Sequence, residues 1–289
     1  MKKISRLLIA YDGSECSDAM LQDLTRAGLP AAAEAVVATI AYVFVPPDNE
    51  VNETDSGPAA ALVRPSQLRA TKAVENALAM AEHAAARIRD SFPGWSVRAK
   101  AEGGTPAWEL VQMADRLDVD LIAIGSHGHS TAGGRLILGS VSQRVLYDAP
   151  CAVRVAGRDE QRGDGPIRIV IGFNGSADAE PALKAVTLRS WPPGTEARSV
   201  NVGRTPSDSV GVAEERLRIA GLIVSEISHH GDPAAVLVHE AESWGADSIF
   251  VGTRNVHGFQ HLLHGSVSAA VAARAHCSVE VVRTKKRIG

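Results

Sequence analysis

The segment GTPAWELVQMADRLDVDLIAIG, residues 104–125, occurs a second time in this chain, as GDPAAVLVHEAESWGADSIFVG at 231–252. Nine identical residues recur there at a constant offset of 127. Further along, GSVS at 139–142 returns as GSVS at 265–268, and Cys151-Ala-Val returns as Cys277-Ser-Val, both at offset 126. A register kept over this length indicates two copies of one domain.

Composition is that of an ordinary soluble protein with room for two cores. The chain has 289 residues, of which 45% are hydrophobic and 22% charged, so each copy has about 140 residues, a common domain size. The formal net charge of −3 argues against nucleic acid or an anionic membrane surface as a partner, because such binding needs clustered Lys and Arg. The longest apolar stretch, Ala35–Val45, is shorter than the roughly 20 residues of a membrane span.

The cysteines and the N-terminus bear on the compartment. Cys16, Cys151 and Cys277 are too few and too scattered for a disulfide framework or a zinc knuckle, which favours a reducing compartment. The start of the chain also lacks the apolar region of a signal peptide. We therefore expect a cytoplasmic protein.

Hydrophobic periodicity predicts that strands alternate with amphipathic helices in each copy. In the first copy the predicted strands are Arg6–Tyr11, Ala35–Phe44, Ser96–Glu102, Leu121–Gly125 and Cys151–Val155. The predicted helices are Asp18–Ala27, Ser66–Asp90, Pro106–Leu117 and one that begins after Gly139. In the second copy the predicted strands are Ile167–Phe173, Ala197–Val202, Leu222–Ser228, Ser248–Gly252 and Cys277–Arg283.

This alternation predicts an α/β fold with two tandem doubly wound domains, each a five-stranded parallel sheet flanked by helices. The domains are expected at 1–157 and 166–289, with Gly163-Asp164-Gly165-Pro166 as the linker. Each final strand would leave a bare sheet edge in an isolated domain, which is an aggregation liability.

Polar and glycine-rich segments follow the predicted strands of the first copy at their carboxyl ends. Asp12-Gly13-Ser14 follows the first strand, Gly125-Ser-His-Gly128 follows the fourth, and Gly139-Ser140 opens the next helix. Ligands of doubly wound sheets bind at this edge. Glycine lets the backbone approach a ligand, and the N–H groups and dipole of a helix start favour an anion. The residues therefore predict a phosphate-binding pocket.

These motifs resemble the universal stress protein family, tandem two-domain type, over nearly the whole chain. The family's nucleotide motif is Gly, two residues, Gly, nine residues, then Gly-Ser or Gly-Thr, with an Asp after the first strand. The first copy keeps both glycines, but its loop up to Gly139-Ser140 is one residue longer. The second copy keeps the spacing, but Asn255 replaces the second glycine and Asn174 replaces the acid.

The resemblance implies a fold like that of the adenine nucleotide alpha hydrolases and an adenine nucleotide, ATP or else ADP or AMP, with Mg, as the ligand. In the first copy it implies these nucleotide-binding residues: Asp12, Val43, Gly125, Gly128, Gly139, Ser140, Val141 and Ser142. The matched positions of a weaker second site are Asn174, Val202, Gly252, Asn255, Gly265, Ser266, Val267 and Ser268. Because Asn174 has no charge for a metal, we expect the first copy to be the stronger site.

The function implied is a stress-response regulator whose nucleotide state changes its conformation or its protein partner. Two other classes remain open: a nucleotide-free interaction module of the same fold, and a slow nucleotide hydrolase. The chain has no Gly-x-Ser-x-Gly elbow and no Gly-x-x-x-x-Gly-Lys-Ser/Thr loop, and no catalytic base stands out. His257, His261 and His264 have helical spacing but no Cys or acid beside them, so a metal site is not expected.

Assembly is the last expectation that the resemblance carries. Members of the family pair through the final strand, so the two copies are expected to form an internal pseudo-dimer, and the whole chain a homodimer. On this basis an isolated fragment 1–157 would self-associate. The segment Pro46–Pro65, which has only the short Gly203–Val210 in the same place of the second copy, is expected to be either a mobile flap or disordered.

Overall fold

The computed structural model describes residues 4–43, 58–127, 138–157, 165–203, 208–253 and 267–283. In the first half the strands are β1 (Arg6–Ala10), β2 (Glu34–Ala41), β3 (Ser96–Gly103), β4 (Leu121–Gly125) and β5 (Ala152–Ala156). The helices are α1 (Glu15–Asp23), followed by a 3-10 turn at Leu24–Arg26, α2 (Pro58–Ser91), α3 (Pro106–Arg116) and α4 (Ser140–Asp148).

The second half repeats this order. Its strands are β6 (Arg168–Gly172), β7 (Glu196–Val202), β8 (Ile223–His229), β9 (Ser248–Gly252) and β10 (Ser278–Val282). Its helices are α5 (Glu180–Thr187), α6 (Asp208–Ile219), α7 (Pro233–Trp244) and α8 (Val267–Arg274). The predicted strand and helix order is therefore confirmed in both halves.

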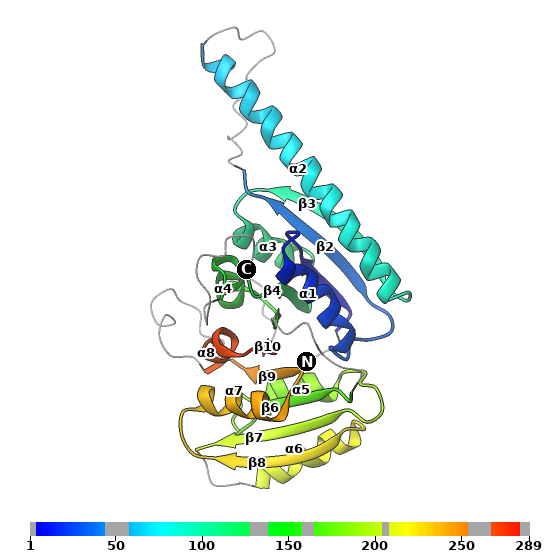
Figure 1. Ribbon diagram of the computed structural model, residues 1–289, viewed down its shortest axis with the longest axis vertical. Helices are drawn as coiled ribbons and strands as arrows, with labels where there is room; N and C mark the ends of the chain where they lie inside the picture. The colour runs from blue at the N-terminus through cyan, green and yellow to red at the C-terminus, as the bar shows by residue number, and fades with distance from the viewer. Residues whose placement is uncertain are drawn as a thin grey trace.

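All ten strands form one sheet in the order β3-β2-β1-β4-β5-β10-β9-β6-β7-β8. Within each half the neighbouring strands are parallel, and only the central pair, β5 with β10, is antiparallel. The two halves therefore lie end to end along the sheet, with β10 and β9 next to the first half (Figure 1). The expected pairing of the final strands within one chain is confirmed.

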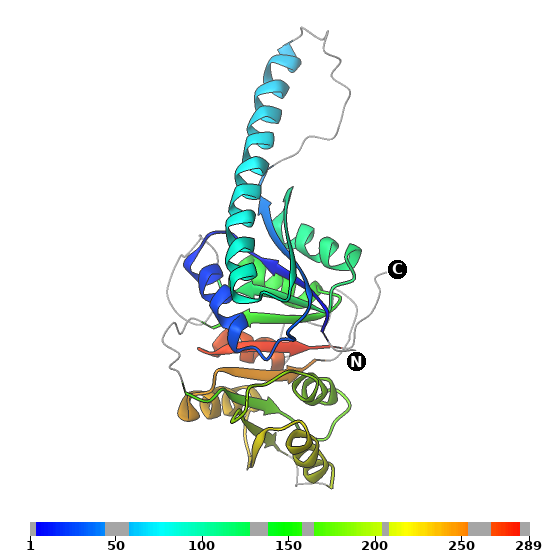
Figure 2. The ribbon, with the colours of Figure 1, turned by 90° about the vertical axis from the view of Figure 1, so that its right-hand side faces the viewer.

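Helices cover both faces of the sheet (Figure 2). On one face α3, α4, α7 and α8 pack on the strands in a single apolar core that runs through both halves. On the other face each half has a core of its own, under α1 and α2 in the first half and under α5 and α6 in the second. Alternate residues of each strand supply the two faces: Leu8 belongs to the shared core, and Leu7 and Ile9 belong to the separate one.

A chain of four buried charges crosses the joint between β5 and β10. The strand register places Arg154 directly opposite Glu280, and both are fully buried. Arg154 donates to Asp23 of α1 through Nε at 2.6 Å and Nη2 at 2.9 Å, and its Nη1 lies 3.5 Å from Glu280. Arg189, beyond α5, donates to the other oxygen of Glu280 at 2.5 Å. We call Asp23, Arg154, Glu280 and Arg189 the charge quartet.

Other contacts extend the joint on both sides of the quartet. Arg26 holds Asp247 of the second half with two hydrogen bonds, of 2.8 and 3.1 Å. The backbone N–H of Ser190 donates to the carbonyl of Gly28 at 2.9 Å. The two halves are thus joined by strand pairing, a common core and complementary charge, and not by the linker alone.

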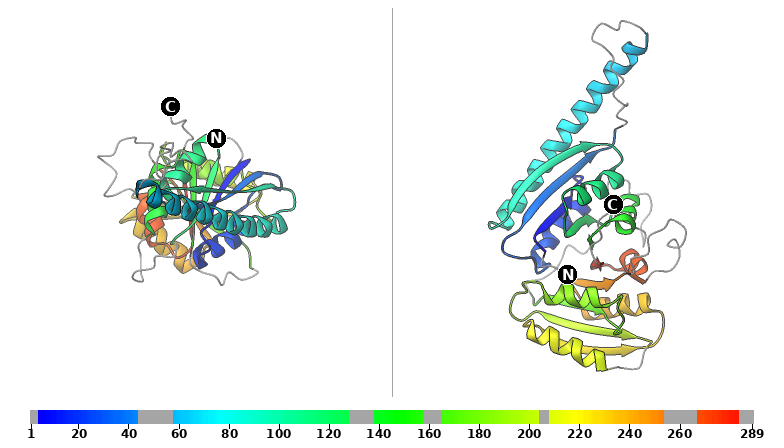
Figure 3. Two further views of the ribbon diagram at one scale, coloured as in Figure 1. Left: turned by 90° about the horizontal axis from the view of Figure 1, so that it is seen from above. Right: turned by 180° about the vertical axis from the view of Figure 1, so that it is seen from behind.

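Several boundaries differ from the sequence-based predictions: α1 begins at Glu15 and not at Asp18, and two further differences concern β2 and α2. Strand β2 ends at Ala41, three residues before the predicted end at Phe44. Helix α2 begins at Pro58, so 58–65 belongs to a helix and not to a flap or a disordered segment, whereas 46–57 lies outside the described residues. The N-terminal part of the helix projects beyond the sheet, and its later part packs on β2 and β3 (Figures 1 and 3). Proline in the first turn costs no helical hydrogen bond, and the alanines that follow favour a helix.

No helix among the described residues has both the length and the hydropathy of a membrane span.

Candidate functional site

The expected site of the first half lies where β1 and β4 end and where α4 begins. Asp12 follows β1 and closes a turn: its Oδ1 accepts from the backbone N–H of Ser14 at 3.1 Å and from the Ser14 hydroxyl at 2.6 Å. Ser14 also caps α1, since its Oγ accepts from the N–H of Ser17 at 3.2 Å. The start of α1 thereby holds Asp12 at the carboxyl edge of the sheet.

The end of β4 is tied to the start of α4. The N–H of Gly139 donates to the carbonyl of Ser126 at 2.9 Å, and the Ser142 hydroxyl donates to the carbonyl of Gly125 at 2.7 Å. Gly139 is the residue before α4. The N–H groups of the first turn have no acceptor within the helix, and they lie at this edge. Backbone donors and the positive end of α4 therefore point toward the region where a phosphate is expected.

Gly125 is required by packing. A β-carbon there would lie 2.9 Å from the carbonyl group of Cys16 and 3.1 Å from the nitrogen of Ser17. The first turn of α1 thus sits directly on the end of β4, and a side chain at 125 would push the two apart. Close packing brings Asp12 and the start of α4 to one edge.

Most of the predicted residues of the first site lie at this edge: Asp12 follows β1, Gly125 ends β4, and Gly139, Ser140 and Ser142 are at the start of α4. Val141 follows in the first turn of α4 and packs against the shared core. Val43 lies two residues beyond β2 at the same edge of the sheet. Gly128 lies outside the described residues. Ser14 and Ser126 lie in the predicted motifs but were not named among the binding residues, and Ser17 was not predicted; a serine just before a helix is a recognisable capping signal.

In the second half the corresponding edge is built differently. Asn174 makes the same turn as Asp12, with its Oδ1 accepting from the N–H of Ser176 at 3.1 Å. Helix α5, however, begins only at Glu180, and the carbonyl of Asp178 packs so closely on Gly252 that a β-carbon at 252 would overlap it. Val267 and Ser268 begin α8, whereas Asn255, Gly265 and Ser266 lie outside the described residues.

The strand register changes one predicted equivalence. Ala10 pairs with Ala38 in the first half and Gly172 pairs with Val200 in the second. Val202 therefore corresponds to Ile40 and not to Val43. Val43 and Val202 both lie at or near the ends of apolar runs, but β2 ends at Ala41, before its apolar run does.

Tyr11 and Asp18 lie beside Asp12 on the α1 side. The Tyr11 hydroxyl donates to Asp18 at 2.9 Å, and Arg87 of α2 forms an ion pair with the same carboxylate. Burial and the bond to Asp18 raise the pKa of Tyr11, so its hydroxyl remains a neutral donor. For Asp18 burial acts to raise the pKa, but the bonds from Arg87 and Tyr11 outweigh it and lower the pKa overall.

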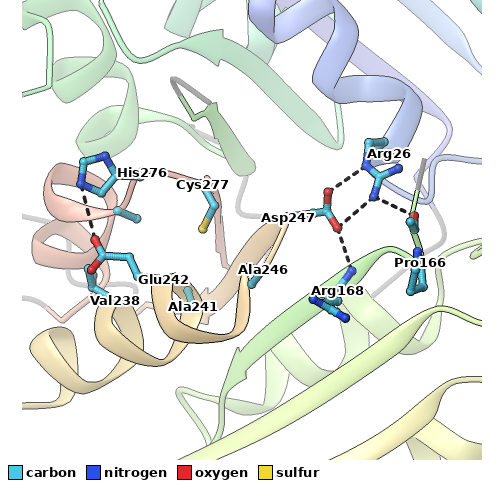
Figure 4. Close-up of a pocket in the computed structure, with 13 residues that line it drawn as sticks. Arg26, Pro166, Arg168, Val238, Ala241, Glu242, Ala246, Asp247, His276 and Cys277 are labelled. Atoms are coloured by element: carbon cyan, nitrogen blue, oxygen red, sulfur yellow. Dashed lines mark hydrogen bonds and ion pairs between the residues drawn. The ribbon is translucent and has the colours of Figure 1, made fainter. Parts of the chain in front are cut away.

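A cavity lies elsewhere, at the amino ends of the strands of the second half (Figure 4). It has a volume of about 470 Å³ and is lined by residues that include Arg26, Arg168, Asp247 and His276. Asp247 is occupied there, since it accepts from Arg26 and from the backbone N–H of Arg168 at 2.8 Å. Asp120, its counterpart in the repeat, accepts from the N–H of Arg6 at 3.1 Å. In both halves, therefore, this aspartate has a structural role: it accepts a hydrogen bond from the first residue of the first strand.

No three His, Cys, Asp or Glu side chains of the described part are placed to hold a metal ion. His257, His261 and His264 lie outside that part.

The fold and this edge define a class of protein: two doubly wound domains, paired in one sheet, each with its polar loops at the carboxyl ends of the strands. The model of the universal stress protein family matches residues 3–156 and 175–283, so the chain belongs to that family as a tandem two-domain member. A universal stress protein of Mycolicibacterium smegmatis is 26% identical over 96% of this chain and 97% of its own length. Universal stress protein Rv2623 of Mycobacterium tuberculosis is 29% identical over 60% and 64%.

A solved universal stress protein from Archaeoglobus fulgidus has the same fold. Its TM-score with this chain is 0.72 at 22% sequence identity, over 96% of this chain and 98% of that one.

Proposed function

We propose that the first half binds an adenine nucleotide, ATP with Mg, at the edge formed by Asp12, Gly125 and the start of α4. The observation that supports this most is the convergence of one carboxylate, one glycine in tight backbone contact and an open helix start. Mg²⁺ in nucleotide sites is usually held by one or two carboxylates together with phosphate oxygens, and Asp12 supplies one carboxylate. Val43 would face the adenine, and Gly128 would complete the phosphate loop.

The second half has a poorer edge for the same ligand. Asn174 has no charge to hold a metal, and α5 begins at Glu180, farther along the chain from Asn174 than Glu15 of α1 is from Asp12. We propose that nucleotide binds the first half in preference, and that any second site formed by Asn174, Val202 and the 252–268 loop is weaker. The function is then that of a cytoplasmic stress-response regulator that has one nucleotide switch and one supporting half.

Calorimetric titration with Mg-ATP tests the proposal, and the repeat supplies the variants. Asn174 shows that asparagine makes the same turn, so Asp12→Asn should fold normally while it removes the charge. We expect Asp12→Asn to weaken Mg-ATP binding about tenfold, the loss of one charge-assisted contact. Asn174→Asp is the matched control, which should leave the first site unchanged. Equal affinity of wild type and Asp12→Asn would place the nucleotide elsewhere.

A nucleotide-free interaction module is the second candidate function, favoured by Asn174 in place of the acid and by the longer loop before Gly139-Ser140. Absence of binding for ATP, ADP and AMP in the same titration would decide for it. Slow hydrolysis is the third candidate, and release of phosphate by wild type above the rate of Asp12→Asn would support it.

A further inference from the structure

The last described residue, Arg283, reaches from the second half into the first. It follows β10, and its guanidinium donates to three backbone carbonyls at the end of α4. Nη1 donates to Tyr147 at 3.3 Å and to Ala149 at 3.0 Å, and Nη2 donates to Leu146 at 2.5 Å. Carbonyls in the last turn of a helix have no N–H donor within the helix, and the helix dipole favours a cation beside them. Arg283 is therefore a C-terminal cap of α4 that comes from the other half.

This cap has no counterpart at the matched position. At offset 126 the repeat equates Arg283 with Gly157, which follows β5 as Arg283 follows β10. Gly157 has no side chain to reach α8, and a β-carbon there would overlap the backbone of His276 and Cys277. The cross-joint cap thus serves only α4, in the half that also has Asp12.

Helix α4 is short and is held at both ends. It has nine residues. Its first turn is tied to the end of β4 through Ser142 and Gly139, at the proposed phosphate position. Its last turn is tied to Arg283, about 13 Å away at a rise of 1.5 Å per residue. We expect a helix this short to move as one rigid unit. Loss of the contact with Arg283 would therefore change the direction in which its first N–H groups point.

We propose that Arg283 is a positioning residue for the nucleotide site of the first half. By capping α4 it aims the opposite end of the helix at the bound phosphate, and it makes phosphate binding in one half depend on the other half. This inference rests on the proposed nucleotide site. It assigns to the second half the role of a support for the first.

Titration of the full chain with Mg-ATP tests the inference. We expect Arg283→Gln to weaken binding about three- to tenfold, a size typical of a partly buried charge at a helix end. Arg283→Lys keeps the charge with fewer donors and should restore part of the affinity. The control is Arg218→Gln, which removes an exposed arginine of α6 paired with Glu214 and should leave affinity unchanged. Equal affinity of Arg283→Gln and wild type overturns the positioning role, even if the variant melts at a lower temperature.

Hydrogen exchange without nucleotide separates this inference from the proposed function. Amides of Gln143–Asp148 should exchange faster in Arg283→Gln than in wild type, and unchanged exchange would overturn the restraint on α4. Failure of wild type to bind Mg-ATP would refute the proposed function, and the exchange experiment would still report on the cap.

Discussion

Arg154 and Glu280 are buried charges that face each other where the two halves meet. They occupy the same position of the repeat, at offset 126, and the antiparallel register brings them face to face. Burial alone would lower the pKa of Arg154, but Asp23 and Glu280 raise it, so the guanidinium is charged inside the joint. The pKa of Arg189 is lowered by burial, against the effect of Glu280. Each buried charge of the quartet therefore depends on its neighbours.

A double-mutant cycle measures that dependence. Arg154→Met leaves a net negative charge in the joint and Glu280→Met leaves a net positive one, so each should cost about 3–5 kcal/mol of unfolding free energy. The double variant leaves Asp23 and Arg189, whose charges cancel. Its cost, measured by denaturant unfolding, should therefore be clearly smaller than the sum of the single costs.

The exposed pair Arg6–Asp118 is the control for this cycle. Its side chains are 45% and 47% exposed at 3.2 Å, and Arg6→Met should cost less than about 1 kcal/mol. Additive costs for Arg154→Met and Glu280→Met would mean that the two residues do not interact.

Glu102, at the end of β3, offers a test of pH dependence. Burial acts to raise its pKa, but ion pairs with Lys100 and Arg116, both at 2.8 Å, lower the pKa overall. A carboxyl whose folded pKa is lowered contributes stability above its unfolded pKa and loses it as the pH falls through the folded pKa. Arg116→Gln should raise the Glu102 pKa in an NMR titration and destabilise the fold at neutral pH but not in strong acid. An equal loss at both pH values would point to packing instead.

Helices α3 and α7 are equivalent in the repeat, and their starts differ in the N-terminal cap. Asp232 caps α7, with its side chain accepting from the N–H of Ala235 at 2.9 Å. Thr105, its counterpart before α3, has an extended backbone of similar angles but makes no side-chain cap bond. Both helices have proline in the first turn. The difference between the two starts therefore lies in the capping side chain.

Aspartate at position 105, as at position 232 of the second copy, should stabilise the first copy. We expect Thr105→Asp to raise the free energy of unfolding by about 0.5–1 kcal/mol, since Asp is the better cap and is favoured by the helix dipole. The reverse exchange, Asp232→Thr, should lower it by a similar amount. Thermal melting of both variants is sufficient, and a destabilised Thr105→Asp would contradict the cap as the cause.

For the whole molecule, the quartet favours pairing between unlike halves. If two first halves paired in the same register, Arg154 would face a second Arg154, and two second halves would bring Glu280 against Glu280. The structure therefore changes the expectation for the fragment 1–157, which should bind itself more weakly than it binds 166–289. Like charges across a buried contact act against the wrong partner.

Cleavage of the folded chain tests this selectivity. With a protease site placed between the two domains, at 158–164, the cut protein should persist as a one-to-one complex of unlike halves in native mass spectrometry. Appearance of dimers of like halves in statistical proportion would refute the selectivity.

A homodimer of the full chain stays a prediction from the family resemblance. Large exposed apolar side chains gather near the free β8 edge of the second half, with Ile219 77% and Ile223 61% exposed, and such an edge is a candidate contact. Sedimentation at micromolar concentration should give twice the 30.4 kDa of one chain. A mass that stays at 30.4 kDa would exclude the dimer.

Features that depend on local pattern could be predicted from the residues alone. The repeat, the alternation of strands and helices and the family all follow from periodicity and motif spacing, because these patterns reflect short-range geometry and burial. The edge that collects Asp12, Gly125 and Gly139 was predictable too, since the carboxyl ends of parallel strands must lie together. Boundaries were less certain: the apolar run after Ala41 extends beyond the strand, and Pro58–Pro65 is helical.

Which residues meet across the joint depends on tertiary packing. The repeat equates Arg154 with Glu280, but equivalence in a repeat does not imply contact, and nothing in the sequence links Arg283 to α4. Each of these residues belongs to an ordinary strand or strand end, and its charge acquires a role only when β5 and β10 pair in one register. The different carboxyl edges of the two halves likewise appear only in the fold, because Asn174 makes the turn of Asp12 while α5 begins farther from that turn than α1 does.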